Sequence, residues 1–499
     1  MQYRSTRSSE CFSPSYALLH GLAQDGGLYV PATFPVNVLS YDMLENKSYQ
    51  ELAQLVLGYF FQNFTEEERY DLVNSAYNSA TFVNPGIVPL HSIDTNISVA
   101  ELFHGRTLAF KDLALSLFPH LLIAAKEQEK EQREILILTA TSGDTGKAAL
   151  EGFKDVKGTN IMVFYPSEGV SPMQAEQMQK QEGQNVKVVA IRGNFDDAQR
   201  FLKQVFTSEE VNAYAEQHDV LFSSANSINI GRLLPQVVYY VAIYAKLVEN
   251  GSITDGEAFD VVVPTGNFGN ILAAYFAKKM GIPIHQLICA SNKNKVLADF
   301  FESGVYDMNR DFYTTASPSM DIVESSNFER FLYYVAKEDG KKVSQWVQSL
   351  RTTGKLAVNP EELAALQEDF CGEWVDDEET QAVIAQVYNT YGYLLDPHTA
   401  VAFSVYLKRA AKQTGKIYHT VVMATAHPFK FPPVVGASLE LAQQSSPYAM
   451  LDAIQACTGI TVPVNLASLQ EKPLRFTEVI DKELMKQAVL KFVDEVAKK

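Results

Sequence analysis

The chain has 499 residues, of which 46% are apolar and 20% are charged. This composition is typical of globular proteins and excludes a disordered, collagen-like or disulfide-scaffold protein. Because a single core rarely grows past about 250–300 residues, we expect two or three domains. The formal net charge of −17 argues against a general nucleic-acid or anionic-membrane binder, but it leaves room for a local phosphate-binding pocket.

The four cysteines lie far apart and show no metal-ligand spacing. We therefore expect neither a disulfide framework nor a metal site, and we expect a cytoplasmic protein. The chain has no run of about 18 apolar residues, which predicts that it does not span a membrane. The first 16 residues faintly resemble a transit peptide but lack the apolar region of a secretory signal.

The first 95 residues read as a mainly helical domain. Residues 26–27 are Gly-Gly and predict a turn into a short strand at 28–31. Apolar residues at helical spacing predict a helix between residues 49 and 64. Thr65, which three glutamates follow, predicts the start of another helix.

From about residue 100, short apolar runs rich in β-formers alternate with helical segments. Nearly continuous apolar character is expected for strands that are covered on both faces, and the alternation indicates βαβ units with parallel sheets. The predicted strands are residues 135–139, 161–165, 186–191, 260–263, 284–290 and 419–424. Parallel sheets bind ligands beyond the carboxyl ends of their strands, so the loops after these runs are the candidate sites.

The first candidate loop is residues 139–146, with the sequence TATSGDTG, before a helix predicted to begin at Lys147. Hydroxyl groups and glycines at a helix start favour an anion-binding nest. A nucleotide P-loop would need G-x-x-x-x-G-K-[ST], but Ala148 follows Gly146-Lys147 and Thr141 occupies the position of the first glycine. A carboxylate is therefore the better ligand.

Two further loops follow predicted strands. Residues 264–270, PTGNFGN, precede a helix predicted at 271–279, and a strand, a glycine-rich turn and a helix form the geometry that cradles a phosphate. The alternative is a tight connection without function. Thr425 follows the last strand, where it either presents a hydroxyl to a ligand or belongs to a structural turn before His427-Pro428.

Lys111 is a further candidate functional residue, because apolar residues surround it in the sequence LAFKDLALSLF. One interpretation is a lysine that reaches solvent or pairs with Asp112. The other is a Schiff-base lysine whose pKa is lowered by burial. A lysine that can hold an aldehyde, a phosphate cradle and a carboxylate nest together describe a pyridoxal phosphate (PLP) enzyme that acts on an amino acid.

At these residues the chain resembles the threonine synthase family, which belongs to fold type II of the PLP enzymes. The resemblance rests on six segments in the family's order, spread over residues 15–430. They are residues 25–31 (DGGLYVP), 102–112 (LFHGRTLAFKD), 139–146 (TATSGDTG), 224–229 (SANSIN), 264–269 (PTGNFG) and 425–428 (TAHP).

The resemblance implies an α/β fold with two three-layer parallel-sheet domains and an N-terminal helical cap. We expect the cap at residues 1–95, a small α/β domain with the reactive lysine at 96–220, and a large α/β domain at 221–436. The large domain would contain the phosphate cradle and an insertion of helices at about 309–379. A C-terminal extension at 437–499 would pack on the large domain.

Residue roles also follow from the resemblance. It implies that Lys111 binds PLP, that Gly266, Asn267, Phe268, Gly269 and Asn270 hold the cofactor phosphate, and that Thr425 hydrogen-bonds the pyridine nitrogen. Ser142, Gly143, Asp144 and Thr145 would hold the substrate carboxylate. Asn226, Ser227, Asn229 and Arg232 are candidate ligands of the substrate phosphate, with a structural role as the alternative for each.

Two positions depart from the family pattern. Arg106 stands where the family usually has proline, so it would either help to bind phosphate or point to solvent. Asn270 stands where many members have an acid, and this change removes a negative charge near the cofactor phosphate.

The implied reaction converts O-phospho-L-homoserine and water to L-threonine and phosphate. Alternatives are a related phospho-lyase, a serine/threonine dehydratase, or a non-catalytic relative that binds PLP. We expect a monomer or weak homodimer with no nucleic-acid or membrane partner.

Overall fold

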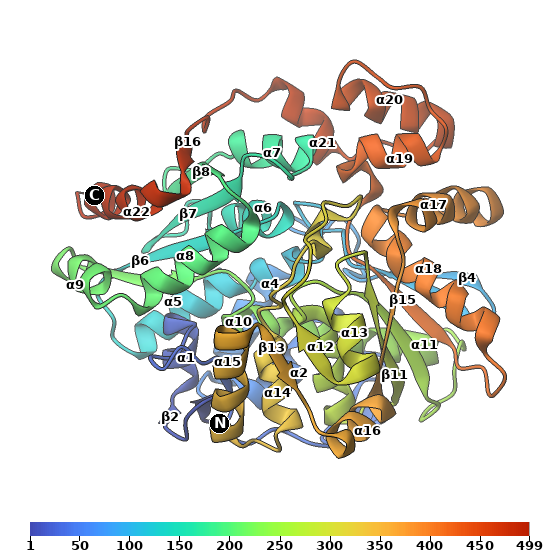
Figure 1. The fold of residues 1–499 in the computed structure, drawn as a ribbon, viewed down its shortest axis with the longest axis horizontal. Helices are drawn as coiled ribbons and strands as arrows, with labels where there is room; N and C mark the ends of the chain where they lie inside the picture. Colours follow the sequence, from blue (N-terminus) through green and yellow to red (C-terminus); the bar gives the residue numbers. More distant parts are fainter. Residues whose placement is uncertain (499) are drawn as a thin grey trace.

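The computed structural model describes residues 1–498, and two parallel sheets divide this part of the chain into two α/β bodies (Figure 1). The small sheet has the strand order β16-β8-β7-β6-β9, and the large sheet has the order β14-β11-β10-β15-β5-β4. Neighbouring strands run parallel except β4 and β5, which are antiparallel. This arrangement is the α/β architecture expected from the alternating pattern.

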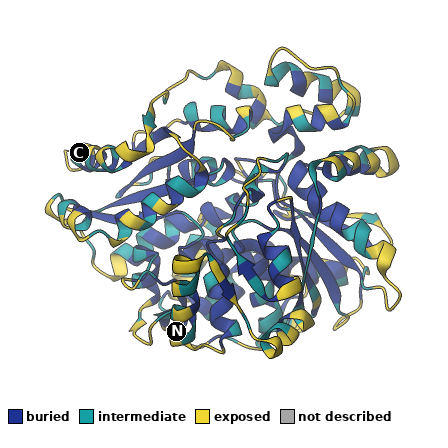
Figure 2. Cartoon of the chain, viewed as in Figure 1, coloured by how far each residue is buried: buried dark blue, intermediate teal, exposed yellow. Residues whose placement is uncertain are grey.

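The small body consists of a buried sheet with helices on both faces. Its central strands are buried along nearly their whole length, as continuous apolar runs predict (Figure 2). Its strands are β6 (Glu134–Ala140), β7 (Thr159–Pro166), β8 (Val186–Arg192), β9 (Val220–Ser224) and β16 (Val479–Asp481). Its helices are α4 (Asp112–Leu115), α5 (Phe118–Gln128), α6 (Asp144–Phe153), α7 (Pro172–Gln179), α8 (Phe195–Thr207) and α9 (Glu209–Gln217).

The large body repeats this plan around its own sheet. Its strands are β4 (Leu90–Asp94), β5 (Ile97–Glu101), β10 (Phe259–Pro264), β11 (Ile284–Ser291), β14 (Phe370–Trp374) and β15 (Thr420–Ala424). Its helices are α10 (Ile230–Leu233), α11 (Pro235–Glu249), α12 (Gly269–Met280), α13 (Val296–Ser303), α17 (Asp377–Tyr391) and α18 (Pro397–Lys412). All six strands expected from the sequence are confirmed, whereas α6 and α12 begin two or three residues before their expected starts.

The N-terminal region combines helices with a small antiparallel sheet. The strands are β1 (Tyr3–Ser5), β2 (Cys11–Phe12) and β3 (Tyr29–Pro31), and the helices are α1 (Pro14–His20), α2 (Tyr49–Phe60) and α3 (Glu66–Ala76). Ser48 and Thr65 cap α2 and α3 through capping boxes, so both expected helices and the strand after Gly26-Gly27 are confirmed.

Strand pairing corrects two expected domain boundaries. β4 and β5 belong to the large sheet, although residues 90–95 were expected in the helical cap and residues 96–101 in the small domain. β9 belongs to the small sheet, because it pairs with β6 beyond the expected boundary at residue 220. The chain crosses between the sheets at both places, and hydropathy alone does not reveal which sheet a buried strand joins.

The insertion is partly helical, as expected, and lies across the front of the large body in Figure 1. It contains α14 (Phe328–Val335), α15 (Gly340–Thr353), β13 (Lys355–Ala357) and α16 (Pro360–Asp369), and β13 pairs with β12 (Val305–Asp307), which precedes the insertion. Besides the expected helices it contributes β14, which pairs with β11 and adds an edge strand to the large sheet.

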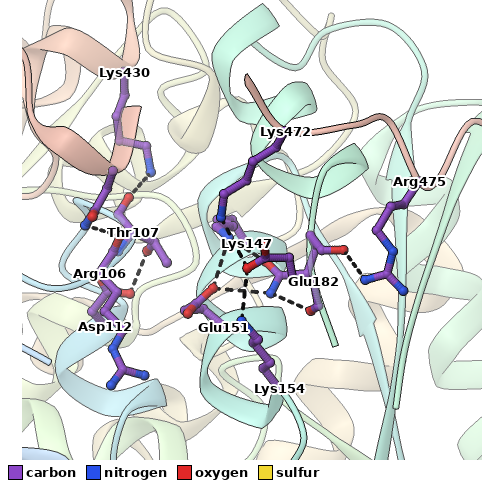
Figure 3. A network of polar contacts seen from close by, with 12 residues as sticks. Arg106, Thr107, Asp112, Lys147, Glu151, Lys154, Glu182, Lys430, Lys472 and Arg475 are labelled. Carbon is purple, nitrogen blue, oxygen red and sulfur yellow. Dashed lines mark hydrogen bonds and ion pairs between the residues drawn. The ribbon is translucent and has the colours of Figure 1, made fainter. Parts of the chain in front are cut away.

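The C-terminal extension packs on both bodies, which corrects the expectation that it covers the large one alone. Its helices α19 (Pro432–Ser438), α20 (Pro447–Thr458) and α21 (Val464–Ala467) lie over the large body, whereas β16 pairs with β8 and α22 (Met485–Val496) packs on the small core. Between them, Lys472 pairs with Glu182, and Arg475 donates to the carbonyls of Gln181 and Gly183 (Figure 3).

Short 3₁₀ turns complete the described structure: η1 (Tyr41–Met43), η2 (Pro318–Met320), η3 (Pro428–Lys430), η4 (Ser468–Glu471) and η5 (Lys482–Leu484). None of the helices in residues 1–498 combines the length and the apolar character that a membrane span requires.

Candidate active site

Lys111 lies immediately before α4, in the segment that leads from β5 of the large sheet into the small body. Backbone pairing holds this segment against the end of β15. The N–H of Phe110 donates to the carbonyl of Thr425 at 2.8 Å, and Ala109 forms a bridge with Ala426. Lys111 and Thr425 therefore line the same cavity although they lie far apart in the sequence.

The Lys111 amine has no hydrogen bond or ion pair to any of residues 1–498, and its Nζ lies 5.5 Å from the centroid of the Phe110 ring. Asp112, the alternative partner, instead accepts hydrogen bonds from the Thr107 N–H at 2.8 Å and the Thr107 hydroxyl at 2.6 Å. Burial lowers the pKa of Lys111 to about 8, because desolvation disfavours the charged amine. The structure thus contains an unpaired, reactive amine.

The loop after β10 forms a cradle between Lys111 and the start of α12. Phe268 adopts a left-handed conformation with φ of 63°, and α12 begins at the next residue. A Cβ on Gly266 would lie 2.6 Å from the Ser319 carbonyl oxygen, so only glycine fits there. All five residues expected to hold a phosphate, Gly266 to Asn270, line the cavity with Lys111.

The side chain of Asn270 has an unused hydrogen-bond donor beside this cradle. Its Oδ1 accepts hydrogen bonds from the hydroxyls of Tyr239 at 2.5 Å and Tyr240 at 2.6 Å. These two donors fix the orientation of the amide, so Nδ2 is left buried without a partner among residues 1–498, and Asn270 lies at the cavity wall. A buried donor without a partner is costly unless a ligand accepts from it.

The loop after β6 brings the start of α6 to the same cavity. The Thr141 hydroxyl accepts the N–H groups of Gly143 and Gly146, which closes the loop. The first-turn N–H groups of α6, at Asp144 and Thr145, have no acceptor within the helix. Ser142, Asp144 and Thr145 line the cavity, as predicted.

Gly143 differs from this prediction, because it is not among the residues that line the cavity. Its φ is 140°, and a Cβ there would lie 2.5 Å from the Gln174 side chain. Glycine at this position serves the backbone conformation and the packing of the loop.

The carboxylate of Asp144 is already engaged by Lys430. The Lys430 Nζ lies 2.7 Å from the Asp144 Oδ1, and the Gln174 amide donates to the same oxygen at 2.7 Å. Although burial opposes it, the positive charges of Lys430 and Lys111 hold the pKa of Asp144 well below its usual range. Asp144 can therefore offer a ligand its backbone N–H but not a hydrogen on its side chain.

The loop after β9 contributes side chains of two kinds. Asn226 and Ser227 line the cavity, and Asn226 bonds both the N–H and the carbonyl of Ala140, which ties this loop to the one after β6. Asn229 does not line the cavity, which corrects its expected ligand role. Its Oδ1 caps α10 at 2.9 Å from the Gly231 N, and its Nδ2 donates to the Leu18 carbonyl at 2.8 Å.

Arg232 is a buried cation that faces the cavity without an acidic partner. Its guanidinium donates to the carbonyl of Ala225, while its Nε has no partner among residues 1–498. Burial lowers the pKa of Arg232 to about 10, which leaves it charged at neutral pH. An unpaired buried cation at a cavity wall favours an anionic ligand.

The sequence reasoning missed several residues around the cavity. Ser319, Met320 and His398 line it, and the Nε2 of His398 accepts the N–H of Ser319 at 3.1 Å. Arg330 is fully buried and donates to the carbonyls of Tyr29 at 2.9 Å and Ser227 at 3.0 Å. No strand-end pattern marks these residues, because Ser319, Met320 and Arg330 lie in the irregular insertion and His398 lies in the first turn of α18.

Arg106 does not reach the cavity. Its side chain is exposed and donates to the carbonyl of Ala80 at 3.2 Å. Arg106 was expected either to help bind phosphate or to point to solvent, and the structure agrees with the second interpretation.

These donors fit PLP. An unpaired amine can bind an aldehyde, the cradle with the Asn270 Nδ2 can hold a phosphate, and the buried Thr425 can face a ring nitrogen with its neutral hydroxyl. The N–H groups of α6 and the Arg232 guanidinium remain available for further anionic groups.

Family comparisons agree with this set of groups. Residues 91–426 match the family described as pyridoxal-phosphate dependent enzyme. Residues 2–77 match the threonine synthase N terminus, and residues 399–489 match the threonine synthase C-terminal region. The three matches cover nearly the entire chain in the expected order.

Individual proteins give the same result. The chain is 37% identical to threonine synthase of Saccharomyces cerevisiae over 98% of its own length and 97% of that protein. It is 39% identical to human threonine synthase-like 1, over 86% of this chain but 58% of that protein. The crystal structure of PLP-bound threonine synthase from Brucella melitensis superposes with a TM-score of 0.85, at 38% identity and over 100% of both chains.

Proposed function

The chain belongs to the threonine synthase family of PLP-dependent enzymes, and we propose that it converts O-phospho-L-homoserine and water to L-threonine and phosphate. The observation that carries this proposal is the meeting of three sites in one cavity. An unpaired amine faces a phosphate cradle, a helix start suited to a carboxylate and an arginine without a counter-ion.

The chain's residues divide the work as follows. Bound PLP supplies an electron sink that makes the substrate's α- and β-protons acidic. We propose that Lys111 Nζ removes and returns these protons, and positioned proton transfer of this kind typically contributes about 10²–10⁴-fold per step. Thr425, which is neutral, would leave the pyridine nitrogen mostly unprotonated and moderate the sink.

The two anionic ends of the substrate would bind at opposite walls. The N–H groups at Asp144 and Thr145 would hold the carboxylate, together with the hydroxyl of Ser142. Arg232 would hold the phosphate. Its positive charge would also stabilise the negative charge that the phosphate gains as it leaves. Each charge-assisted hydrogen bond contributes about 1.5–3 kcal/mol, which is enough to select the phosphorylated substrate over homoserine.

Product identity is the decisive test, because the PLP-binding groups do not separate a synthase from a phospho-lyase or a dehydratase. The purified protein with PLP should convert O-phospho-L-homoserine to threonine and phosphate in equal amounts, measured by chromatography of the products. Ketobutyrate as the main product would overturn the proposed reaction. The similarity to proteins named threonine synthase-like 1 makes this measurement necessary.

Replacement of Lys111 tests the role of the amine. Lys111→Ala should reduce turnover to background and should abolish trapping of PLP on the protein by borohydride, measured by mass spectrometry. Lys180→Ala is a matched control, because Lys180 is a buried lysine in an ion pair with Glu176 at 2.7 Å and is absent from the cavity. Retained turnover in the Lys111 variant would falsify the assignment.

We also propose a cytoplasmic protein that is a monomer or a weak homodimer. The four unpaired cysteines support a reducing compartment. Sedimentation at several protein concentrations would test the oligomeric state, and a stable higher oligomer would contradict it.

A further inference from the structure

Lys430 is a second lysine at this site, and it is fully buried at the end of η3. Its Nζ donates to the Thr107 carbonyl at 2.8 Å and pairs with the Asp144 Oδ1 at 2.7 Å (Figure 3 shows the contact with Thr107). Lys430 thereby joins three segments: the one that leads to Lys111, the start of α6 and the loop that begins at Thr425. Fully buried lysines are rare and occur almost only in pairs. The pairing of Lys430 with Asp144 beside the cavity therefore suggests a specific role for Lys430.

The charges around Lys111 come from three elements. Asp144 at the start of α6 favours its protonated form, whereas Arg232 on α10 and Lys430 on η3 oppose it. Burial opposes the anion of Asp144, whereas the charges of Lys430, Lys111 and His398 favour it. The positive charge of Lys430 therefore offsets part of the effect of the Asp144 anion on Lys111. Without Lys430, Asp144 would be an uncompensated anion beside both the amine and the helix start.

We propose that Lys430 is a positioning residue that works together with Asp144: its positive charge offsets the negative charge of this carboxylate, which keeps Lys111 available as a free base and keeps the start of α6 open to an anion. The second part rests on the proposed function, because it identifies that anion as the substrate carboxylate. The first part concerns only two amines and a carboxylate of this chain, and it can be measured without substrate.

The test is a charge cycle of four proteins: the wild type, Lys430→Met, Asp144→Asn and the double variant. In the PLP-free protein, the titration midpoint of Lys111 is measured by acetylating the protein over a pH series and quantifying the acetylated peptide that contains Lys111. In the PLP-loaded protein it is read from the pH dependence of the cofactor absorption. A nearby charge typically moves a midpoint by about one pH unit or more. We expect Lys430→Met to raise the Lys111 midpoint by about one unit and Asp144→Asn to lower it by about one unit.

The double variant removes both charges and should return the midpoint close to that of the wild type. Each single change leaves a buried charge without its partner, whereas the double variant leaves none. The double variant can therefore still be measured if a single variant folds poorly. Lys430→Arg keeps the charge and should preserve the midpoint. General disruption of the fold would not produce opposite shifts from the two single changes.

Lys180 provides a matched control away from the cavity. It is also buried, pairs with Glu176 at 2.7 Å and donates to the Leu469 carbonyl at 2.8 Å. Lys180→Met should leave the Lys111 midpoint unchanged. Shifts of the same sign from Lys430→Met and Asp144→Asn, or no shift from either, would overturn the proposal.

Substrate binding separates this inference from the proposed function. Lys430→Met should weaken binding of O-phospho-L-homoserine at least tenfold, and the double variant should recover part of the loss. If the midpoints shift as expected but threonine is not the product, the role of Lys430 stands and the proposed reaction falls. If threonine forms but the midpoints do not move, the reverse holds.

Discussion

The absence of a counter-ion at Lys111 has a direct consequence for its reactivity. Burial lowers the pKa of Lys111 from the ordinary value of 10.5 to about 8, so a useful fraction of the amine is uncharged near neutral pH. Only the uncharged amine can attack the aldehyde of PLP. The same burial that makes a charged lysine costly therefore prepares this one for covalent chemistry.

The pH dependence of PLP capture should follow from this shift. In PLP-free protein, the rate of capture should rise with pH and reach half of its maximum near pH 8, because protonation of Lys111 blocks the reaction below that value. Rapid-mixing absorbance over a pH series measures the rate. A rate that keeps rising up to the ordinary lysine pKa of 10.5 would show that the amine is not desolvated.

At single positions, prediction from the sequence succeeded where a residue type was unusual for its surroundings. Lys111 stood out in an apolar run, and the cradle residues followed a predicted strand. Lys430 carries the same signal, since Phe429 and Phe431 flank it, but a lysine near a proline also fits an exposed turn. Asn229 shows that a matching segment does not define a role, because its side chain caps a helix, which is the structural alternative that the sequence left open.

Strand-end loops are the elements that build this cavity, and the insertion supports one of them from outside. The Ser325 hydroxyl donates to the Gly266 carbonyl at 2.9 Å, and the Asn327 N–H donates to the Asn267 carbonyl at 3.1 Å. Hydrogen bonds from the insertion therefore hold the cradle loop on the side away from α12. The close approach of Ser319 to Gly266 leaves no room for a side chain.

Gly266→Ala should consequently weaken PLP binding. The new Cβ would lie 2.6 Å from the Ser319 carbonyl oxygen, so either the cradle or the insertion must move. We expect at least a tenfold rise in the dissociation constant of PLP, which corresponds to about 1.4 kcal/mol. Fluorescence titration of the PLP-free protein measures it. Gly415→Ala is the control, since a Cβ there would have no atom of residues 1–498 within 4 Å apart from its chain neighbours. Equal affinities for the two variants would contradict the argument.

Among the strands, those with continuous apolar runs could be predicted from the sequence. The edge strands that pair with them could not. β14 is half-buried at the sheet edge and lies in an acidic, aromatic stretch, so its sequence lacks the pattern of an interior strand. β16 has three residues and gains its place only by pairing with β8. Such edge strands are specified by tertiary contacts rather than by local pattern.

The whole molecule consists of two bodies that one chain connects repeatedly. The chain passes between the two sheets after β5, after β9 and again through the C-terminal extension, which runs from α20 across α7 to β16 in Figure 1. The cavity lies where the carboxyl ends of β6 and β9 face those of β10 and β15. The general plan could be predicted from βαβ alternation, but the return of the C-terminus to the small sheet could not.

The return of the C-terminus makes α22 part of the small core, and Met485→Ala tests this role. Met485 is fully buried among residues of α22 and the small body, and truncation of a buried methionine typically costs about 2–5 kcal/mol. Lys491→Ala on the exposed face of the same helix should change stability by less than about 0.5 kcal/mol. Hydrogen exchange with mass spectrometry localises the effect: Met485→Ala should accelerate exchange in β8 and leave α18 unchanged. Equal exchange in both variants, or acceleration confined to the large body, would show that the small sheet does not depend on this helix.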